Sequence, residues 1–582
     1  MRPRWLPPPP TPPEAAILAR SIGVSLLVGG LLYSRGVQDA PSAERFLNPL
    51  LEHLHDPSLL PDIDAAVDRL ALAVDRGERI LVHGDYDVDG VCAAALLTRV
   101  LRVLKADVRE FVPHRIEDGY DLQPETVRRA ATEGTRLILT TDCGIVAFES
   151  VALARELGID VIVTDHHEPD PNGRLPDAVA VVNPHRLDSR YPWPSISGTA
   201  VAFKLATALV RKRGIATASF AKAYLDLVAL ATCADCMPLR DENRALVVHG
   251  LQTLRTTNKP GLKALMKISR VEPDRLNARS LGFALGPRIN AVGRMDAAAH
   301  ALELLLTTDP MEAELLARRL DDANLERQKE QTRIVTDATR IAERHLDDPV
   351  MVLASHNWMA GIIGIVAGRM TEVHGRPVVL IAIDEETGTG RGSCRSIEGF
   401  DIRDALEGCR EHLNRFGGHA AAAGFDIRAD RIDAFRDALC GVAREKMDGE
   451  DLSPRLRIDI EARAEELDLK LAQELGRLEP FGVDNPEPLI LCRGLEVLEQ
   501  KRLPGRSESG SAHMRLKFRA GARGGVGAVF WQAWDRYAAD CAPGTRVDAC
   551  FTLGTNTWNG NTSAQLDLKD LRPAEGGSFP VG

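Results

Sequence analysis

Three short apolar runs in the first half of the chain each end at acidic or imidazole side chains, and this feature constrains the fold more than any other. The runs cover residues 80–83, 137–141 and 161–164. Segments with helical periodicity separate them, which predicts βαβ units around a parallel sheet. Because ligands bind outside the carboxyl ends of the strands in an open α/β sheet, the polar side chains are expected to meet at one edge.

The first run leads into an acidic loop that contains Asp85, Asp87 and Asp89. If the backbone stays extended, these alternate side chains share one face. Carboxylates so close together repel one another unless a cation neutralises them. The flanking glycines, Gly84 and Gly90, are expected to permit tight turns. Taken alone, the loop is as well explained by a solvated acidic turn.

The second and third runs add side chains that favour a metal site. The second ends at Asp142, and the third ends at Asp165, His166 and His167. A lone histidine is usually structural, but adjacent histidines after an aspartate at a third strand end are much harder to explain by chance. Carboxylates with imidazole suit Mg²⁺ or Mn²⁺, of which Mn²⁺ is the better acceptor of nitrogen ligands. A further apolar helical run ends at Asp235, which alone indicates only a helix end.

Together these segments read GDYDVDG, DCG, DHH and ADCMPL in chain order, and they resemble the motif series of the DHH phosphoesterase family. The resemblance is specific because separate motifs agree in sequence and in succession. It implies metal ligands at Asp85, Asp87, Asp89, Asp142, His166 and Asp235. It also places His167 beside the reacting phosphate, and Asp165 is expected to support the histidines. His167, Asp165 and Asp142 are therefore the candidate catalytic residues.

Other motifs resemble the RecJ exonucleases within that family, and the resemblance extends over about residues 25–570. They cover residues 113–120, 286–295, 391–396 and 417–425. Each alone is explained as well by an ordinary turn, but glycine-flanked Ser, Arg and His can offer N–H groups to a phosphate. The candidate nucleic-acid and phosphate-binding residues are Arg115, Tyr120, Arg288, Asn290, Ser393, Arg395 and His419.

Two departures from the family pattern bear on substrate handling. Met359 follows Trp358 where the family usually has a histidine. Any function of that histidine is absent here or is carried by His356. Asp121 stands where the family usually has glycine, which adds negative charge near the expected DNA path. Neither departure touches the expected metal ligands.

The fold class expected is α/β, with two α/β domains joined by a long helix and followed by an OB-like β-barrel. The barrel is expected from short alternating segments separated by Gly, Asn and Pro. The proline-rich residues 1–13 are expected to be disordered. Residues 402–414 are expected to form one helix. The expected domains are an N-terminal lead-in (1–75), a DHH domain (76–309), a connecting helix (310–348), a DHH-associated domain (349–450) and the barrel (451–582).

Composition supports an ordinary globular enzyme. The chain has 582 residues and a net charge of −11, which excludes a uniformly basic surface but not a basic groove. Its ten cysteines include only one C-x-x-C, at Cys233 and Cys236, which is too few for a zinc site. The apolar stretch 22–32 is too short to span a membrane, so a cytoplasmic protein is expected. A monomer is expected by default.

The resemblance implies a single-stranded-DNA-specific 5′→3′ exonuclease that releases 5′-mononucleotides, in DNA repair and recombination. Two divalent cations, Mn²⁺ or Mg²⁺, would act together, with Asp142 or Asp87 bridging them. Single-stranded DNA is the expected partner, and a single-strand-binding protein or a helicase is a candidate protein partner. The alternatives are a small-substrate phosphodiesterase of the nanoRNase or cyclic-dinucleotide type, which is usually shorter, and a non-catalytic DNA-binding scaffold.

Strand selectivity has two candidate sources: a groove between the α/β domains too narrow for a duplex, and the barrel surface. Phe530, Trp531, Trp534 and Trp558 could stack on bases or pack in the core. The arginine-rich segment 501–523 could bind phosphates or form a solvated loop.

Overall fold

The computed structural model describes residues 2–114, 119, 121–295, 298–447, 454–505, 512–520 and 524–574, with backbone alone at 292–295. The chain forms two compact units. The larger unit holds residues 5–293, 297–318 and 456–582, and the smaller unit holds residues 1–4, 294–296 and 319–455. Arg115 and Tyr120, two of the candidate phosphate-binding residues, lie outside the described residues.

The larger unit contains the predicted parallel sheet. Its strands are β2 (Ile80–Gly84), β3 (Val108–Phe111), β4 (Leu137–Thr141), β5 (Asp160–Thr164) and β6 (Ala180–Val182). Their order is β3-β2-β4-β5-β6, and every neighbouring pair is parallel. The prediction of a parallel α/β sheet is confirmed, and the carboxyl ends of β2, β4 and β5 lie at the same edge.

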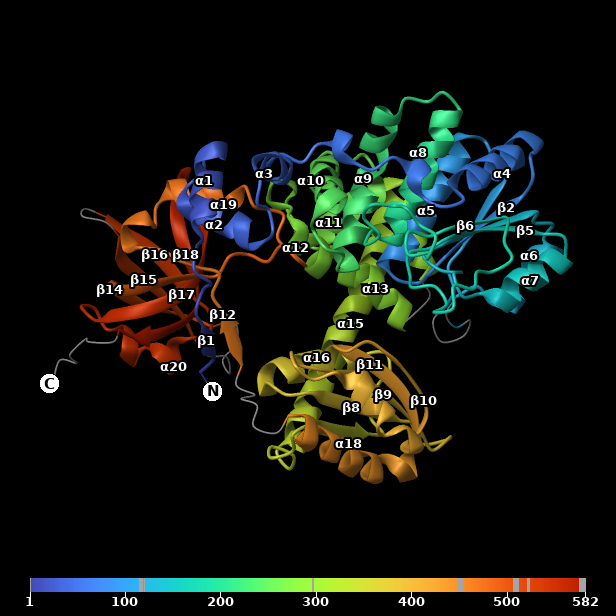
Figure 1. Cartoon of the computed structure of the whole chain (residues 1–582). Helices are drawn as coiled ribbons and strands as arrows, with labels where there is room; N and C mark the ends of the chain where they lie inside the picture. The colour runs from blue at the N-terminus through green and yellow to red at the C-terminus, as the bar shows by residue number, and fades with distance from the viewer. Residues whose placement is uncertain are drawn as a thin grey trace. The chain divides into compact units, whose positions relative to one another are not determined.

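Helices cover both faces of this sheet. They include α5 (Val88–Val103), α6 (Pro124–Thr132), α7 (Phe148–Glu156) and α8 (Gly198–Lys212), and α9 (Thr217–Ala234) packs on α5 and α8. Helices α6 and α7 lie side by side (Figure 1) and pack with Ile138 on one face. Leu139 points to the other face, which α5 and α8 cover, and it is equally buried. Burial on both faces explains why the strands are continuously apolar.

The N-terminal segment is more ordered than its composition suggests. Helices α1 (Pro13–Ile22), α2 (Leu26–Ser34), α3 (Ala40–Leu47) and α4 (Ile63–Arg76) confirm the predicted helical lead-in.

No single helix in the described part of the chain is long and apolar enough to cross a membrane. Helices α1 and α2 meet the length and hydropathy requirement only as a pair, which is bent by 114°.

The prediction that residues 1–13 are disordered is wrong for the strand β1 (Arg4–Leu6), which pairs with β12 (Arg455–Arg457). Trp5 Nε1 donates a hydrogen bond of 2.7 Å to Asp570 Oδ2, and the Arg572 guanidinium lies 4.3 Å from the indole centre. Proline-rich composition does not show that a single tryptophan anchors the segment to a distant buried carboxylate.

The smaller unit has a five-stranded mixed sheet in the order β10-β11-β9-β8-β7. Its strands are β7 (Met351–Ser355), β8 (Val378–Ile383), β9 (Thr389–Arg395), β10 (Leu413–Gly418) and β11 (Ala422–Arg428). Its helices are α16 (Ile363–His374), α17 (Ile402–Glu407) and α18 (Ile432–Lys446). The long helix α15 (Pro310–Ala342) runs from one unit into the other, as predicted.

The single helix predicted for residues 402–414 is wrong. Helix α17 stops at Glu407, a short 3₁₀ turn covers Arg410–His412, and β10 begins at Leu413. Strand β10 pairs along its length with β11, for example Phe416 with Phe425. Tertiary pairing therefore overrides the helical periodicity of the local sequence.

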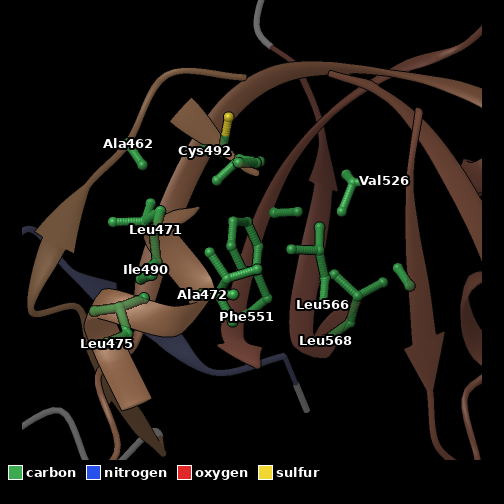
Figure 2. Packing of buried hydrophobic residues seen from close by; sticks show 14 of the residues in the cluster. Ala462, Leu471, Ala472, Leu475, Ile490, Cys492, Val526, Phe551, Leu566 and Leu568 are labelled. Atoms are coloured by element: carbon green, nitrogen blue, oxygen red, sulfur yellow. The ribbon is translucent and has the colours of Figure 1, made fainter. Parts of the chain in front are cut away.

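The predicted barrel is present in the larger unit. Strands β14 (Ile490–Leu503), β15 (His513–Ala520), β16 (Gly524–Phe530), β18 (Asn561–Pro573) and β17 (Arg546–Trp558) follow one another, and β17 pairs with β14 to close the ring. Helix α19 (Leu469–Gly476) packs against the barrel strands. Figure 2 shows Leu471 and Leu475 of this helix in the same apolar cluster as Phe551 and Leu566.

Further helices follow α9 in the chain and lead to the connecting helix. They are α10 (Asp241–Arg255), α11 (Pro260–Ile268), α12 (Ala278–Ser280), the π-helical turn Leu281–Leu285, α13 (Gly286–Met295) and α14 (Ala299–Leu306). Arg244 of α10 is buried and donates hydrogen bonds to the carbonyls of Phe46, Leu478 and Glu479. This side chain ties the N-terminal helices and the segment before the barrel to the α/β part.

Candidate metal centre

The acidic loop between β2 and α5 does not stay extended. Helix α5 begins at Val88, and Asp87 is its N-cap, where Oδ1 accepts hydrogen bonds from the amides of Asp89 (2.9 Å) and Gly90 (3.1 Å). Asp89 consequently lies in the first helical turn. The acidic side chains meet because the strand stops and a helix begins between them, and not because alternate residues of a strand share a face.

The two glycines of the loop serve close packing rather than the tight turns that the sequence suggests. Neither Gly84 nor Gly90 has a positive φ. A Cβ atom on Gly90 would lie 2.4 Å from the Asp85 amide nitrogen, and one on Gly84 would lie 2.8 Å from the Gly90 carbonyl oxygen. Only glycine therefore lets the start of α5 fold back onto the end of β2.

The side chains predicted as ligands converge. Ligand atoms of Asp85, Asp87 and Asp142 lie within 4.8 Å of one another. The same holds for Asp89, His166 and Asp235, and for Asp142, His166 and His167. Asp142 and His166 are shared between groups, so the three groups form one cluster at the carboxyl edge of the sheet.

His166 lies at the middle of this cluster. Its Nε2 is 3.1 Å from Asp142 Oδ1, 3.6 Å from Asp235 Oδ2 and 3.7 Å from Asp89 Oδ2. Asp142 adopts the left-handed conformation, with φ of 62°, which is uncommon outside glycine. Its position directly after β4 and this backbone conformation together turn its carboxylate toward the histidine.

Burial and mutual repulsion oppose ionisation of the carboxyl groups in the absence of a cation. These effects raise the pKa of Asp85 and that of Asp235 to about 8. The pKa of Asp87 is raised for the same reasons, and that of Asp142 is raised well above its usual value. Burial lowers the pKa of His166, which favours the neutral imidazole that can bind a metal.

The donor set fits hard divalent cations. Asp235 Oδ2 is buried and accepts no hydrogen bond within the described part of the chain. A buried carboxylate oxygen without a donor is costly unless a cation takes that place. Carboxylate oxygens with one or two imidazole nitrogens are the ligands expected for Mn²⁺ or Mg²⁺.

Asp165 orients both histidines. Its Oδ1 accepts hydrogen bonds from the His166 amide (2.7 Å) and from His167 Nδ1 (2.8 Å), while its Oδ2 accepts one from the Ile145 amide (3.0 Å). Burial acts to raise the pKa of Asp165, but the hydrogen bonds from His167 and the backbone hold it below its usual value. Burial acts to lower the pKa of His167, but the bond to Asp165 raises it to about 9.

Two residues beside the cluster were missed by the sequence interpretation. Asp89 accepts hydrogen bonds from the amides of Gly198 (2.6 Å) and Thr199 (2.7 Å), at the N-terminus of α8. A Cβ atom on Gly198 would lie 2.4 Å from Asp142 Oδ1, so only glycine fits there. The available signal was Ser197, a typical helix N-cap before an apolar run.

The predicted phosphate-binding residues lie in both units. In the larger unit, Asn290 Oδ1 accepts a hydrogen bond from the Val88 amide (3.0 Å), and Arg288 donates to the Ala284 carbonyl. In the smaller unit, Ser393 and Arg395 lie on β9. His419 lies in the turn between β10 and β11, where its amide donates to the Ala422 carbonyl. Asn290 thus contacts the acidic loop itself.

The departure at Asp121 has a different consequence from the one expected. Its side chain is buried and accepts a hydrogen bond from the Leu122 amide (2.8 Å), so it does not project a charge into solvent. Burial raises its pKa to about 6. Its φ is 70°, a conformation that glycine adopts readily, which accounts for the glycine usual in the family.

The second departure from the family pattern is Met359, which follows Trp358 in place of histidine, and its side chain is partly exposed. The neighbouring Trp358 Nε1 donates to Asp337 Oδ2 (2.9 Å), and His356 Nδ1 lies 3.8 Å from a Glu385 carboxylate oxygen.

Comparison with protein families accounts for most of the chain. Residues 79–232 match the model of the DHH family N-terminal domain. Residues 347–445 match the DHHA1 domain, and residues 458–570 match the RecJ OB domain.

Relatives match over nearly the whole length. The chain is 36% identical to the single-stranded-DNA-specific exonuclease RecJ of Bacillus subtilis over 98% of this chain and 71% of that protein. It is 36% identical to RecJ of Escherichia coli, with 94% of this chain and 96% of that protein covered.

A solved structure shares the fold. The crystal structure of RecJ in complex with Mn²⁺ from Thermus thermophilus has a TM-score of 0.81 and 31% identity, over 98% of this chain and 79% of that one. The same protein in complex with Mg²⁺ has a TM-score of 0.75.

Proposed function

Because the chain belongs to the RecJ family of single-stranded-DNA-specific exonucleases, we propose that it removes nucleotides from single-stranded DNA by metal-dependent hydrolysis. One observation carries this proposal: carboxylates and imidazoles from four separate segments of the chain form a single, largely buried cluster. A scaffold without catalysis has no need to keep such a costly set of side chains together.

We assign the cluster to two divalent cations, Mn²⁺ or Mg²⁺. The ligands would be Asp85, Asp87, Asp89, Asp142, His166 and Asp235. Asp142 belongs to two of the ligand groups and is the candidate for bridging. When bound, the cations supply a nucleophile at neutral pH and neutralise charge on the phosphate.

The protonated His167 is the candidate group for stabilising charge on the phosphoryl oxygens. Asp165 accepts a hydrogen bond of 2.8 Å from its Nδ1–H and raises its pKa to about 9 in the metal-free chain, which favours the protonated ring. The second N–H, at Nε2, is then the donor that we assign to the phosphate. Asp165 acts through the histidine and is a positioning residue.

Phosphate groups further along the strand are assigned to basic and polar side chains. Arg288 lies on α13, and Ser393, Arg395 and His419 lie at glycine-rich turns and strands of the smaller unit. We propose that cleavage proceeds from the 5′ end and releases 5′-mononucleotides, in DNA repair and recombination. A single-strand-binding protein or a helicase is the proposed protein partner.

The barrel offers a second contact surface. Trp531 and Trp558 are 57% and 75% exposed, whereas Phe530 is buried and Trp534 packs against the core. Lys501 of β14 lies directly opposite Arg515 of β15, and both are exposed. Like charges in register repel, and a phosphate would relieve the repulsion. We propose that the exposed tryptophans stack on bases while this pair binds backbone phosphates.

Digestion of end-labelled DNA tests the function. The wild-type chain is expected to degrade single strands, but not duplexes, with Mn²⁺ or Mg²⁺ and to be inactive in EDTA. Asp142→Ala is expected to abolish activity while circular dichroism stays unchanged, because a shared ligand is lost. Full activity in Asp142→Ala, or preference for a dinucleotide over a long strand, would refute the proposal.

A further inference from the structure

The acidic loop, residues 85–90, needs something to hold it in place before any cation binds. Its carboxylates repel one another and lie in a buried cluster. Within the described part of the chain, no lysine or arginine forms an ion pair with Asp85, Asp87 or Asp89. The loop is instead held by hydrogen bonds at two points, and both partners come from distant segments.

The first point is the N-terminus of α8. Both oxygens of Asp89 accept backbone hydrogen bonds, from Gly198 and from Thr199. Thr199 Oγ1 also donates to the Asp89 carbonyl oxygen (2.8 Å). Thr199 therefore holds the side chain and the main chain of one residue. The partial positive charge at a helix N-terminus favours the carboxylate in this place.

The second point is the Val88 amide, which lies between two ligands in the sequence. The first amides of a helix have no partner within the helix and need caps. In α5, Asp87 caps the amides of Asp89 and Gly90, and Asn290 Oδ1 caps the amide of Val88 at 3.0 Å. Asn290 completes the cap and thereby sets the backbone on which Asp87 and Asp89 are mounted.

Asn290 reaches the loop because α13 approaches it closely. A π-helical turn, Leu281–Leu285, directly precedes α13. At Gly286, a Cβ atom would lie 3.3 Å from the Ala234 Cβ and 3.8 Å from a Val88 methyl group. Helix α13 therefore packs against both the acidic loop and the residue before Asp235. Wider turns of this kind are frequent at functional sites.

We infer that Thr199 and Asn290 are positioning residues that hold Asp87 and Asp89 ready for the cations. The inference rests on the proposed metal site, and it gives Asn290 a role different from phosphate binding. Because neither side chain is itself a ligand in this assignment, its loss weakens metal binding without removing a donor. Changes to groups that orient metal ligands typically lower metal affinity by about 10–100-fold.

The test measures Mn²⁺ binding to the full chain by calorimetry, without DNA. Thr199→Val keeps the shape of the side chain and removes its hydroxyl group, and Asn290→Ala removes the cap of Val88. Both are expected to weaken Mn²⁺ binding by about 10–100-fold. Activity should return toward the wild-type kcat when Mn²⁺ is saturating, because every ligand is still present.

Two matched variants separate positioning from general damage. Thr199→Ser keeps the hydroxyl group and should restore Mn²⁺ affinity. Thr207→Val changes a threonine on the same helix, whose hydroxyl group donates a hydrogen bond to the Phe203 carbonyl oxygen. The Mn²⁺ affinity of this variant should equal that of the wild type. If Asn290→Ala does not fold, the comparison of Thr199→Val with Thr199→Ser tests the inference by itself.

Wild-type Mn²⁺ affinity in folded Thr199→Val and in folded Asn290→Ala would overturn the inference. So would an equal loss of affinity in Thr199→Ser and Thr199→Val. Failure of the proposed function gives a different result. If the variants differ in Mn²⁺ affinity as expected but the wild-type chain leaves DNA intact, the nuclease assignment is contradicted and the positioning roles are not.

Discussion

Single side chains set the proton balance of the metal centre. Asp85, Asp87, Asp142 and Asp235 all have a raised pKa because they are buried together. Asp165, which lies among them in the fold, has a lowered pKa because it is surrounded by donors. Identical carboxyl groups thus divide into proposed cation ligands, whose pKa is raised, and Asp165, whose pKa is lowered by the hydrogen bonds that it accepts.

The Asp165–His167 pair gives a pH-dependent prediction for the metal-free chain. The pKa of His167 is raised from 6.5 to about 9, so the protonated ring stabilises the folded state. This stabilisation is fully present below pH 6.5 and is lost as the pH rises through about 9. In Asp165→Asn the anion is gone, and the pKa of His167 should fall below its wild-type value.

NMR titration of the His167 ring in EDTA measures this change directly. The wild-type ring should titrate near pH 9, well above an ordinary histidine. If the ring titrates at the same pH in Asp165→Asn and in the wild type, the hydrogen bond does not control the proton. The role assigned to His167 at the phosphate would then lose its basis.

Among the secondary-structure elements, the hairpin of β17 and β18 has an exposed tip at residues 554–563. Asn559 and Gly560 form its turn, and both have positive φ, as a two-residue hairpin turn requires. Trp558 directly precedes the turn and is 75% exposed. An aromatic ring so exposed adds nothing to the core, which favours a role in binding.

Trp558→Ala is therefore expected to weaken binding of long single-stranded DNA and to leave stability unchanged. Stacking of one base on an aromatic ring contributes about 1–3 kcal/mol. Fluorescence anisotropy with a labelled oligonucleotide measures the affinity, and Trp558→Phe, which keeps an aromatic ring, should retain most of it. Equal affinity in Trp558→Ala and the wild type would remove Trp558 from the contact surface.

At the scale of the whole molecule, segments that are far apart in the sequence meet in the barrel. Trp5 and Asp570, 565 residues apart, form a hydrogen bond, and Tyr537 donates to the other carboxylate oxygen at 2.6 Å. Asp570 is completely buried. Trp5 is thus tied to the last strand of the barrel, although the domain boundaries expected from the sequence, 1–75 and 451–582, stay predictions.

Trp5→Phe tests this contact because it keeps an aromatic ring and removes only the N–H donor. A buried carboxylate that loses a donor costs about 1–3 kcal/mol. The barrel is expected to unfold at a lower guanidinium concentration, measured by circular dichroism. Trp531→Phe, at a position 57% exposed, serves as the control and should have no effect. An unchanged midpoint for Trp5→Phe would show that the strand β1 adds nothing to the barrel.

The sequence by itself determined the parallel sheet, the long helix α15 and the barrel, and it pointed to the acidic and histidine side chains that cluster at the edge of the sheet. Apolar periodicity reports burial directly, and ligands at strand ends must share an edge once the strands are parallel. The sequence also sufficed for family membership, because motifs such as those at Asp142 and His166 occur in a specific order.

Only the tertiary structure decided how the proposed ligands are held. It showed that Asp87 is a helix cap, that Gly90 serves close packing, and that Asn290 and Thr199 secure the acidic loop. It likewise turned the end of the helix predicted at 402–414 into β10 and gave Trp5 a partner. These features depend on contacts between residues far apart in the chain, and local sequence patterns carry no information about such distances.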